Sequence, residues 1–293
     1  MKTILYLCYG DGPQIDETRF SLMSAFRFGS PETCDHQFVV YTENPGQFAG
    51  LGVKIVELDA ATLDAWLGRD GYAHRRKTMT IVNAMRRFPG SVVFVDCDTY
   101  FLKPPAALFS KLGHGRTRLH ILEGRLIESR NAANRMLSEI VAAHTFFDLN
   151  GREFTICPDA AMWNSGVLGI DSRDARLMDE TLNLIDQMWP LVKNAPVAIH
   201  HVEQFATGYF FGTSQISESH DIVYHYWPES VRLPFRKRLP ALLAIAADAS
   251  PAERGKLIFC ERPRTDYLWK LKIGMRTGLR RMGLRVPGIR CSA

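Results

Sequence analysis

The 293-residue chain lacks the motifs that mark several common classes of nucleotide-binding and hydrolytic proteins. No G-x-x-x-x-G-K-[ST] loop follows any predicted strand, which excludes a P-loop. No G-x-G-x-x-G follows the first strand, and Gly10-Asp11-Gly12 supports a dinucleotide fold only weakly. A Ser-His-Asp hydrolase needs a G-x-S-x-G turn, and this motif is also absent.

Long apolar runs and paired cysteines are scarce as well. No run approaches the roughly 20 apolar residues that a membrane-spanning helix needs. The first apolar run, Ile4–Tyr9, is short for a signal peptide and predicts a strand, so we expect a cytoplasmic protein. The six cysteines form no C-x-x-C pair, which argues against a zinc knuckle and predicts free thiols, with Cys97 as a small buried residue.

The net charge of +5 is unevenly distributed along the chain. Residues 262–293 hold nine basic residues and one acid, which leaves 27 basic and 30 acidic residues, a net charge of −3, for the first 261. This distribution argues against a nucleic-acid-binding core. It predicts an anionic partner for the C-terminal end alone.

Predicted strands alternate with predicted helices, and this pattern indicates an α/β fold with a doubly wound, mainly parallel sheet. The strands are expected at residues 2–9, 37–41, 53–58, 92–95, 119–122, 161–170 and 221–227, and the helices at 16–28, 60–67, 75–88, 131–147, 175–191 and 202–211. We expect a catalytic domain over residues 1–230, with a donor half at about 1–105 and an acceptor half at about 106–230. Residues 231–293 are expected to form a basic extension.

The stretch from Ser91 to Pro105 contains the first candidate site. Its apolar run Val92–Val95 predicts a strand buried on both faces, and Asp96-Cys97-Asp98 follows directly. Carboxylates at i and i+2 lie on the same side of an extended chain, and the carboxyl end of such a strand is where ligands bind in open α/β sheets. The pair predicts a site for a divalent cation that also grips a diphosphate, and the alternative is a pair of acids capping a strand end.

Asn164-Ser165-Gly166 interrupts a second apolar strand. Polar groups within a buried run need partners, which the hydroxyls of a sugar would supply. Gly166 would then let the sugar approach the backbone closely. The alternative is a β-bulge at a sheet edge.

These motifs, followed by Glu203-Gln204 and His225, resemble in their order the GT-A fold glycosyltransferases, and most closely glycosyltransferase family 8 and its relatives. The resemblance covers residues 2–227. It implies that Asp96 and Asp98 hold Mn²⁺ or Mg²⁺, that Asp96 also contacts the nucleotide ribose, and that His225 is the third metal ligand. The alternatives for His225 are a core histidine, or a ligand role for His200, His201 or His220 instead.

The same resemblance implies further contacts with a nucleotide-diphosphate sugar. Lys77, with Arg75 and Arg76, would face the donor, although a solvated helix face is the alternative. Tyr9 would stack on the base, or else belong to the core. Gln204 would lie beneath the anomeric carbon of a retaining enzyme, whereas Glu203, where the family has Asp, would be the general base of an inverting one.

The sequence therefore predicts a metal-dependent hexosyltransferase that uses a nucleotide-diphosphate sugar, UDP-linked, with retention of configuration. Its acceptor would be a glycan or glycolipid of a bacterial-type surface polysaccharide or lipopolysaccharide. The alternatives are a nucleotidyltransferase, whose basic Gly-rich loop is missing after the first strand, a metal phosphohydrolase, or a non-catalytic protein that binds nucleotide sugars.

The C-terminal stretch 267–285 combines apolar and basic residues. At helical spacing Leu268, Leu271, Met275, Leu279 and Met282 share one face, and basic residues flank it. This composition is typical of a helix that lies on an anionic membrane, here the inner face of the cell membrane. The alternative is a terminal helix packed on the catalytic domain.

Overall fold

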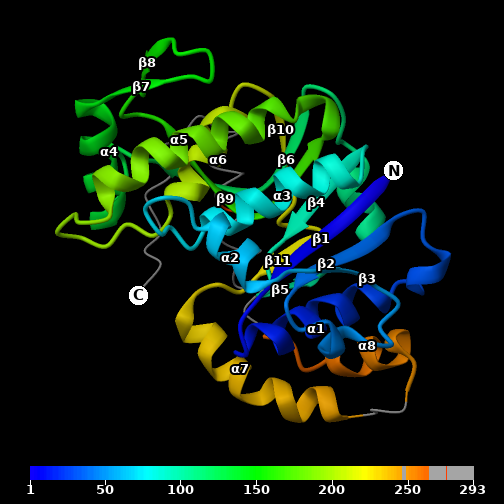
Figure 1. The fold of residues 1–293 in the computed structure, drawn as a ribbon. Helices are drawn as coiled ribbons and strands as arrows, with labels where there is room; N and C mark the ends of the chain where they lie inside the picture. The colour runs from blue at the N-terminus through cyan, green and yellow to red at the C-terminus, as the bar shows by residue number, and fades with distance from the viewer. Residues whose placement is uncertain (246–248, 264–274, 276–293) are drawn as a thin grey trace.

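The protein is described here by a computed structural model that covers residues 1–245, 249–263 and 275. Its main sheet has seven strands in the order β10-β6-β9-β4-β1-β2-β3 (Figure 1). β9 is antiparallel to both of its neighbours, and the other pairs are parallel. The predicted α/β class with a mainly parallel sheet is therefore confirmed.

The strands of this sheet are β1 (Lys2–Cys8), β2 (Gln37–Thr42), β3 (Lys54–Glu57), β4 (Ser91–Val95), β6 (Arg116–Arg125), β9 (Ala161–Asp171) and β10 (Gln215–Glu218). Two small antiparallel sheets lie beside it. One pairs β5 (Thr99–Phe101) with β11 (Val223–His225), and the other pairs β7 (Thr145–Phe147) with β8 (Glu153–Thr155).

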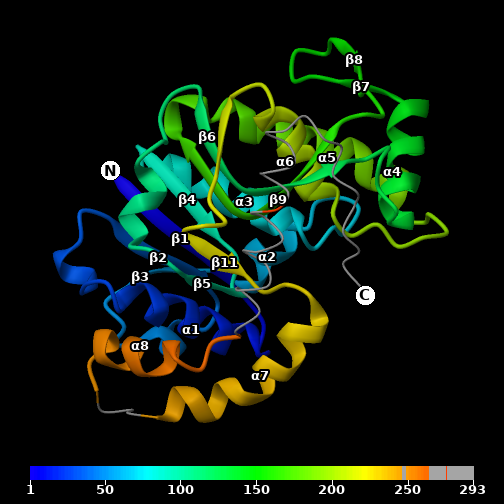
Figure 2. The same ribbon diagram turned by 180° about the vertical axis from the view of Figure 1, so that it is seen from behind.

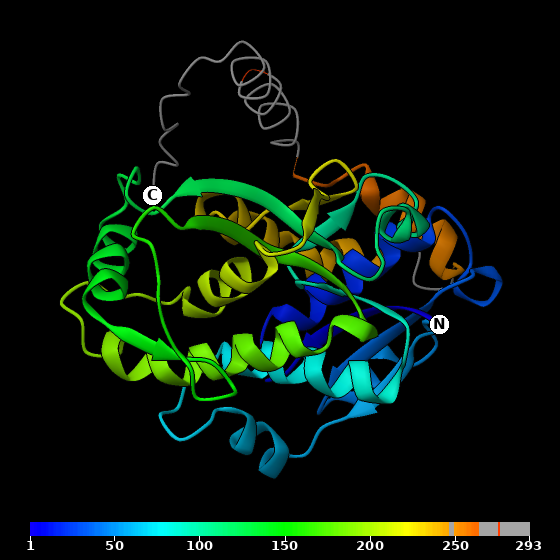
Figure 3. The ribbon, with the colours of Figure 1, turned by 90° about the horizontal axis from the view of Figure 1, so that it is seen from above.

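Helices cover both faces of the sheet (Figures 1 and 2). One face carries α1 (Gln14–Phe26), α7 (Glu229–Ala244) and α8 (Pro251–Phe259), and the other carries α2 (Ala60–Trp66), α3 (Arg75–Arg87), α5 (Arg176–Val192) and α6 (Val202–Phe211). α4 (Ala132–Ala143) packs on α5, and α3 lies along α5 in the view from above (Figure 3). Short 3₁₀ turns occupy Pro31–Thr33, Pro45–Phe48, Pro105–Phe109 and Ser172–Asp174.

The alternation of side chains along β1 shows why the sheet is buried on both faces. Ile4, Tyr6 and Cys8 pack into the core beneath α1, α7 and α8. Leu5 and Leu7 belong to the opposite core, beneath α2 and α3. A strand with apolar residues at every position can satisfy two such cores, as parallel sheets require.

Two local expectations were wrong. The helix predicted over 131–147 ends at Ala143, because the β-prone Thr145–Phe147 pairs with Glu153–Thr155 as a hairpin. The Pro-rich stretch after Pro228, for which no element was predicted, forms α7 with Pro234 and Pro240 inside it.

α7 and α8 both pack against α1 and contribute Phe235, Leu239 and Ile258 to its core. The expected boundary between residues 230 and 231 falls within α7. The amphipathic helix expected at 267–285 lies outside the described residues except for Met275. No helix among those described combines the length and apolar character of a membrane span.

Candidate metal and donor site

The loop Asp96-Cys97-Asp98 crosses from the end of β4 in the main sheet to β5 in the small one. The backbone N–H of Asp96 donates to the carbonyl of Gly166 at 2.8 Å, which extends the pairing of β4 with β9 by one residue. Asp96 is half-buried and Asp98 is 5% exposed. Cys97 is half-buried and its thiol donates to the Leu7 carbonyl at 3.2 Å, on the core side of the loop.

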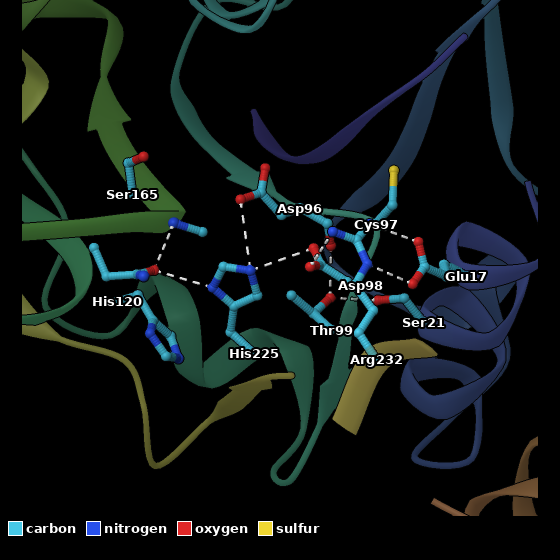
Figure 4. Close-up of polar contacts among 12 residues, drawn as sticks. Glu17, Ser21, Asp96, Cys97, Asp98, Thr99, His120, Ser165, His225 and Arg232 are labelled. Atoms are coloured by element: carbon cyan, nitrogen blue, oxygen red, sulfur yellow. Dashed lines mark hydrogen bonds and ion pairs between the residues drawn. The ribbon is translucent and has the colours of Figure 1, made fainter. Parts of the chain in front are cut away.

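His225 reaches this loop because β11 pairs with β5. Its Cα partner in that pairing is Thr99, and the next N–H, from Tyr226, donates to the Asp98 carbonyl at 3.0 Å. The Nε2 atom of His225 lies 3.3 Å from Oδ1 of Asp98 and 3.9 Å from Oδ2 of Asp96 (Figure 4). The three side chains thus meet at the carboxyl end of β4, although they come from two sheets.

Asn164 fixes the orientation of the imidazole. Its Oδ1 accepts from the Gly166 N–H at 2.9 Å, and its Nδ2 donates to Glu123 at 2.9 Å. Because Oδ1 is an acceptor, Nδ1 of His225, 3.0 Å away, must be the donor. The neutral ring then keeps its lone pair on Nε2, which faces the two carboxylates.

Gly166 makes room for the same ring. A Cβ atom at this position would lie 2.2 Å from Nδ1 of His225, which no side chain tolerates. The space beside Gly166 is thus filled by the imidazole. Contacts of Asn164, Ser165 and Gly166 with a sugar stay predictions.

The donor set suits a divalent cation. Among the described residues, Asp96, Asp98 and His225 form the one group of three or more metal-ligating side chains, with ligand atoms within 4.8 Å of one another. Two carboxylates and one imidazole are ligands that Mn²⁺ and Mg²⁺ accept. His200, His201 and His220, the other histidines considered, do not belong to this group.

Buried charges tune the pKa values of the two most enclosed ligands. Burial opposes ionisation of Asp98, yet His225 and Arg232 hold the pKa of its carboxyl well below the usual range. Burial likewise opposes protonation of His225, but the adjacent Asp98 carboxylate raises the pKa of the ring. Both shifts favour the ion pair of the metal-free site, in which Nε2 of His225 carries a proton that a bound cation would replace.

Lys77, in the first turn of α3, lies on the other side of Asp96. Its ammonium donates to the Ser165 carbonyl at 2.8 Å and to the Ser165 hydroxyl at 3.0 Å. It lies 3.3 Å from Asp96 and 3.7 Å from Glu203. Burial works against the charge, but Asp96 and Glu203 raise the pKa of Lys77, so the ammonium is retained.

Arg75 and Arg76, which precede Lys77 on α3, have other partners in the structure, and their contact with a donor stays a prediction. Arg75 forms a bidentate ion pair with Asp186 at 2.7 and 2.9 Å. Arg76 donates to the Leu63 carbonyl and lies 4.7 Å over the ring of Tyr9, which it shields on one face. Successive residues on a helix point about 100° apart, which is why these three side chains have different partners.

Glu203 and Gln204 lie in the first turn of α6 and differ in exposure. Glu203 is 4% exposed and accepts from Ser165 at 3.1 Å and Thr207 at 3.2 Å. Burial raises the pKa of its carboxyl, against the opposing effect of Lys77. Gln204 is half-buried and donates to Glu123 at 3.0 Å.

Sequence reasoning missed three residues around the site. Glu123 on β6 accepts from both Asn164 and Gln204. Arg232 on α7 lies 2.9 Å from Asp98, and it is also paired with Glu17 on α1. None of the three belongs to a recognisable motif. The one sequence feature that includes any of them is the basic stretch after Pro228, which contains Arg232.

A separate cleft of about 1040 Å³ opens between the β7–β8 hairpin, α5 and the end of α6. Its wall includes the rings of Phe154, Trp163 and Tyr209. Phe154 and Tyr209 stack with centroids 5.8 Å apart. The two carboxylates and His225 do not line this cleft.

No protein-family model and no curated protein sequence matches the chain. Among solved structures, it is similar to the galactosyltransferase LgtC in complex with donor and acceptor sugar analogs, at 11% identity and a TM-score of 0.49 over 74% of both chains. It is also similar to mouse xyloside xylosyltransferase 1, at 13% identity and a TM-score of 0.44, over 74% of this chain and 84% of that one. A third is the bifunctional glycosyltransferase WbbM, at 11% identity and a TM-score of 0.43, over 82% of this chain and 44% of that one. At these identities the likeness concerns the fold.

Proposed function

We propose that the protein is a metal-dependent glycosyltransferase that transfers a hexose from a UDP-sugar to a glycan or glycolipid, with retention of configuration. The observation that carries the proposal is the convergence of Asp96, Asp98 and His225 at the carboxyl end of β4. A divalent cation bound there supplies positive charge where a diphosphate leaving group becomes more negative.

The protein's own groups would fix both the cation and the sugar. Asp98 presents one oxygen beside Nε2 of His225, and Asn164 keeps that ring in the ligating tautomer. Lys77 holds a buried positive charge next to Asp96, where the donor's phosphates and sugar would lie. Because its contacts with the two carboxylates are 3.3 Å or longer, the ammonium can re-pair with a bound anion.

The exposures of Glu203 and Gln204 favour retention. A general base must reach the acceptor hydroxyl, but Glu203 is 4% exposed and already accepts from two hydroxyls. Gln204 is half-buried, and its amide stands beside the carboxylate of Glu123. We therefore assign Gln204 to the face of the sugar opposite the leaving group. Glu203 would hold Lys77 in place.

The cleft between the β7–β8 hairpin and α6 offers a place for the acceptor. Aromatic faces such as those of Trp163 and Tyr209 pack well against the apolar face of a sugar ring. Tyr209→Ala would then raise the acceptor KM and leave hydrolysis of the donor by water unchanged. An unchanged acceptor KM would rule this cleft out as the acceptor site.

A lipid-linked acceptor would suit the basic, amphipathic sequence at 267–285. Truncation after Arg262 would abolish binding to vesicles that contain anionic lipid and spare hydrolysis of the soluble donor. Equal vesicle binding by the full-length and truncated proteins would contradict the membrane role of the tail.

The central experiment is a donor screen. UDP-, GDP- and CMP-sugars are tested for thermal stabilisation and for hydrolysis, each with and without Mn²⁺. We expect stabilisation and turnover with a UDP-hexose that depend on the metal. Binding without turnover, in the presence of candidate acceptors, would indicate a non-catalytic sugar-nucleotide binder instead.

A further inference from the structure

A buried carboxylate far from the Asp96–Asp98 motif in sequence accepts hydrogen bonds from two arginines at both of its oxygens. Glu17 on α1 is fully buried. Its two oxygens accept four hydrogen bonds from two arginines of α7: Arg232 donates at 2.8 and 2.7 Å, and Arg236 donates at 2.9 Å twice. Two bidentate pairs saturate the carboxylate, which a buried ion requires.

Arg232 differs from Arg236 because it also reaches the metal ligands. Its Nε and Nη2 atoms donate to Glu17, and its Nη1 atom lies 2.9 Å from Oδ2 of Asp98 (Figure 4). All three nitrogens of the guanidinium therefore have a carboxylate partner. The planar fork cannot rotate without breaking at least one of these contacts.

This contact divides the two oxygens of Asp98 between different partners. Oδ2 faces Arg232, whereas Oδ1 lies 3.3 Å from Nε2 of His225, on the side of the metal ligands. With one oxygen engaged by the arginine, Asp98 offers a single oxygen to a cation. Its rotation about the Cβ–Cγ bond is blocked by the same ion pair.

A second chain of hydrogen bonds from α1 holds the backbone of the loop. The Ser21 hydroxyl lies 2.8 Å from the Thr99 hydroxyl, which donates to the Asp96 carbonyl at 2.8 Å. Ser21 and Glu17 are four residues apart and so lie on one face of α1. This face contacts the loop at its backbone through Thr99 and at its side chain through Arg232.

We propose that Glu17 and Arg232 are positioning residues for the metal centre: the buried Glu17 fixes the Arg232 guanidinium, which restricts Asp98 to one metal-facing oxygen. The inference rests on the proposed function, since it concerns the same metal site. The proposal gives α7, which follows His225 in the sequence, a role in the donor site.

Electrostatics and geometry predict opposite effects of losing Arg232, so the test must separate them. Deleting a cation beside Asp98 would by itself strengthen the binding of a second cation. Arg232→Lys keeps the charge and removes the fork, which isolates the positioning effect. Loss of an outer partner of a metal-binding carboxylate typically lowers metal affinity by about 10–100-fold.

The matched control is Arg236→Lys. It makes the same conservative change on the arginine that shares Glu17 but, among the ion pairs of the described residues, does not pair with Asp98. Both variants lose one bidentate contact with Glu17, so both should lose similar thermal stability. Mn²⁺ affinity is measured by isothermal titration on the full chain, with and without UDP.

We expect Arg232→Lys to weaken Mn²⁺ binding by about tenfold or more, and Arg236→Lys to leave it within about twofold. Glu17→Gln should weaken Mn²⁺ binding too, because it loosens Arg232 and leaves its positive charge less compensated. Equal Mn²⁺ affinities for the wild type and Arg232→Lys would overturn the inference, and so would equal weakening by both arginine variants. Absence of Mn²⁺ binding by the wild type, with and without UDP, would instead overturn the metal centre of the proposed function.

Discussion

Two buried charged clusters flank the Asp96–Asp98 loop, and they are built differently. On the α1–α7 side, Arg232 and Arg236 each form a bidentate pair with Glu17 at 2.7–2.9 Å, and Arg232 also lies 2.9 Å from Asp98. On the α3–α6 side, one lysine lies between two carboxylates at 3.3 and 3.7 Å, and its short contacts go to Ser165. We call these the arginine side and the lysine side.

The difference shows how one site can be rigid where it binds metal and adaptable where it binds substrate. A guanidinium fork has a fixed geometry, so it suits a ligand that must keep its position. An ammonium is a point charge with rotatable donors, so it can exchange one carboxylate for another anion without a change of shape.

The largest effect is expected on the arginine side, from Asp98→Asn. This change removes a charged ligand, so metal-dependent turnover of the donor should fall by at least about 10³-fold. Turnover is measured at saturating Mn²⁺, and thermal unfolding verifies that the fold remains. Asp64→Asn, at a carboxylate that is 77% exposed, serves as control. Full metal-dependent turnover in Asp98→Asn would contradict the metal role of this pair.

At the edge of the lysine side, Gln204→Ala should be more damaging than Glu203→Gln. Removal of a polar group that contacts the reacting sugar costs about 10²-fold in kcat, whereas Glu203→Gln keeps the shape and should cost about tenfold. NMR of the product should show the donor's anomeric configuration. An inverted product, with a loss of about 10²–10⁴-fold in Glu203→Gln, would identify Glu203 as a general base.

Lys77→Met tests how much the ion pairs of the lysine side contribute to the free energy of unfolding. Breaking a buried ion pair from one partner usually costs about 3–5 kcal/mol. We expect about 2 kcal/mol here, because Asp96 is half-buried and Glu203 can take up a proton. Urea denaturation without metal measures the loss. Adding Glu203→Gln to Lys77→Met should restore part of the stability, and a purely additive double variant would show that the two do not interact.

The smallest expected effect is a difference in pH dependence between the two sides, with metal removed by a chelator. The pKa of Asp98 is lowered in the folded state, so its contribution is present above the unfolded pKa and is lost as pH falls through the folded one. The pKa of Glu203 is raised by burial, so stability falls as pH rises from the unfolded toward the folded value.

Each of these two dependences of the unfolding free energy on pH should disappear when the carboxylate responsible is replaced by its amide. Asp98→Asn should flatten the loss of unfolding free energy below about pH 4. Glu203→Gln should flatten the decline above that pH. The measurement is the free energy of unfolding in urea at pH 3–7, and equal slopes in the wild type and both variants would contradict the assignment.

The fold and the two carboxylates were predictable because their signals are local. An apolar run flanked by Pro89-Gly90 predicts β4, and the period of a strand places Asp96 and Asp98 on one side. β11, by contrast, has only three residues, and it pairs with β5, which lies about 120 residues earlier in the sequence. Local sequence patterns do not predict pairing between strands so far apart. For this reason the sequence left His225 among several candidate histidines.

The arginine side could not be predicted from the sequence. An ion pair between residues far apart in the chain, such as Glu17 and Arg232, leaves no periodic pattern. Glu17 reads as an ordinary acid in the first turn of α1, and Arg232 as one of several bases in a Pro-rich stretch.

The pairing of Glu17 with Arg232 joins residues 215 positions apart, and this separation has a consequence during synthesis. At typical rates of translation, about 10–40 s pass between the appearance of the two residues. Throughout that interval Glu17 has no arginine to neutralise it, and a lone carboxylate resists burial. The inner face of α1 must therefore stay hydrated on the nascent chain. We expect the N-terminal half to remain open to protease until α7 has left the ribosome, after which α1, α7 and the metal site close together.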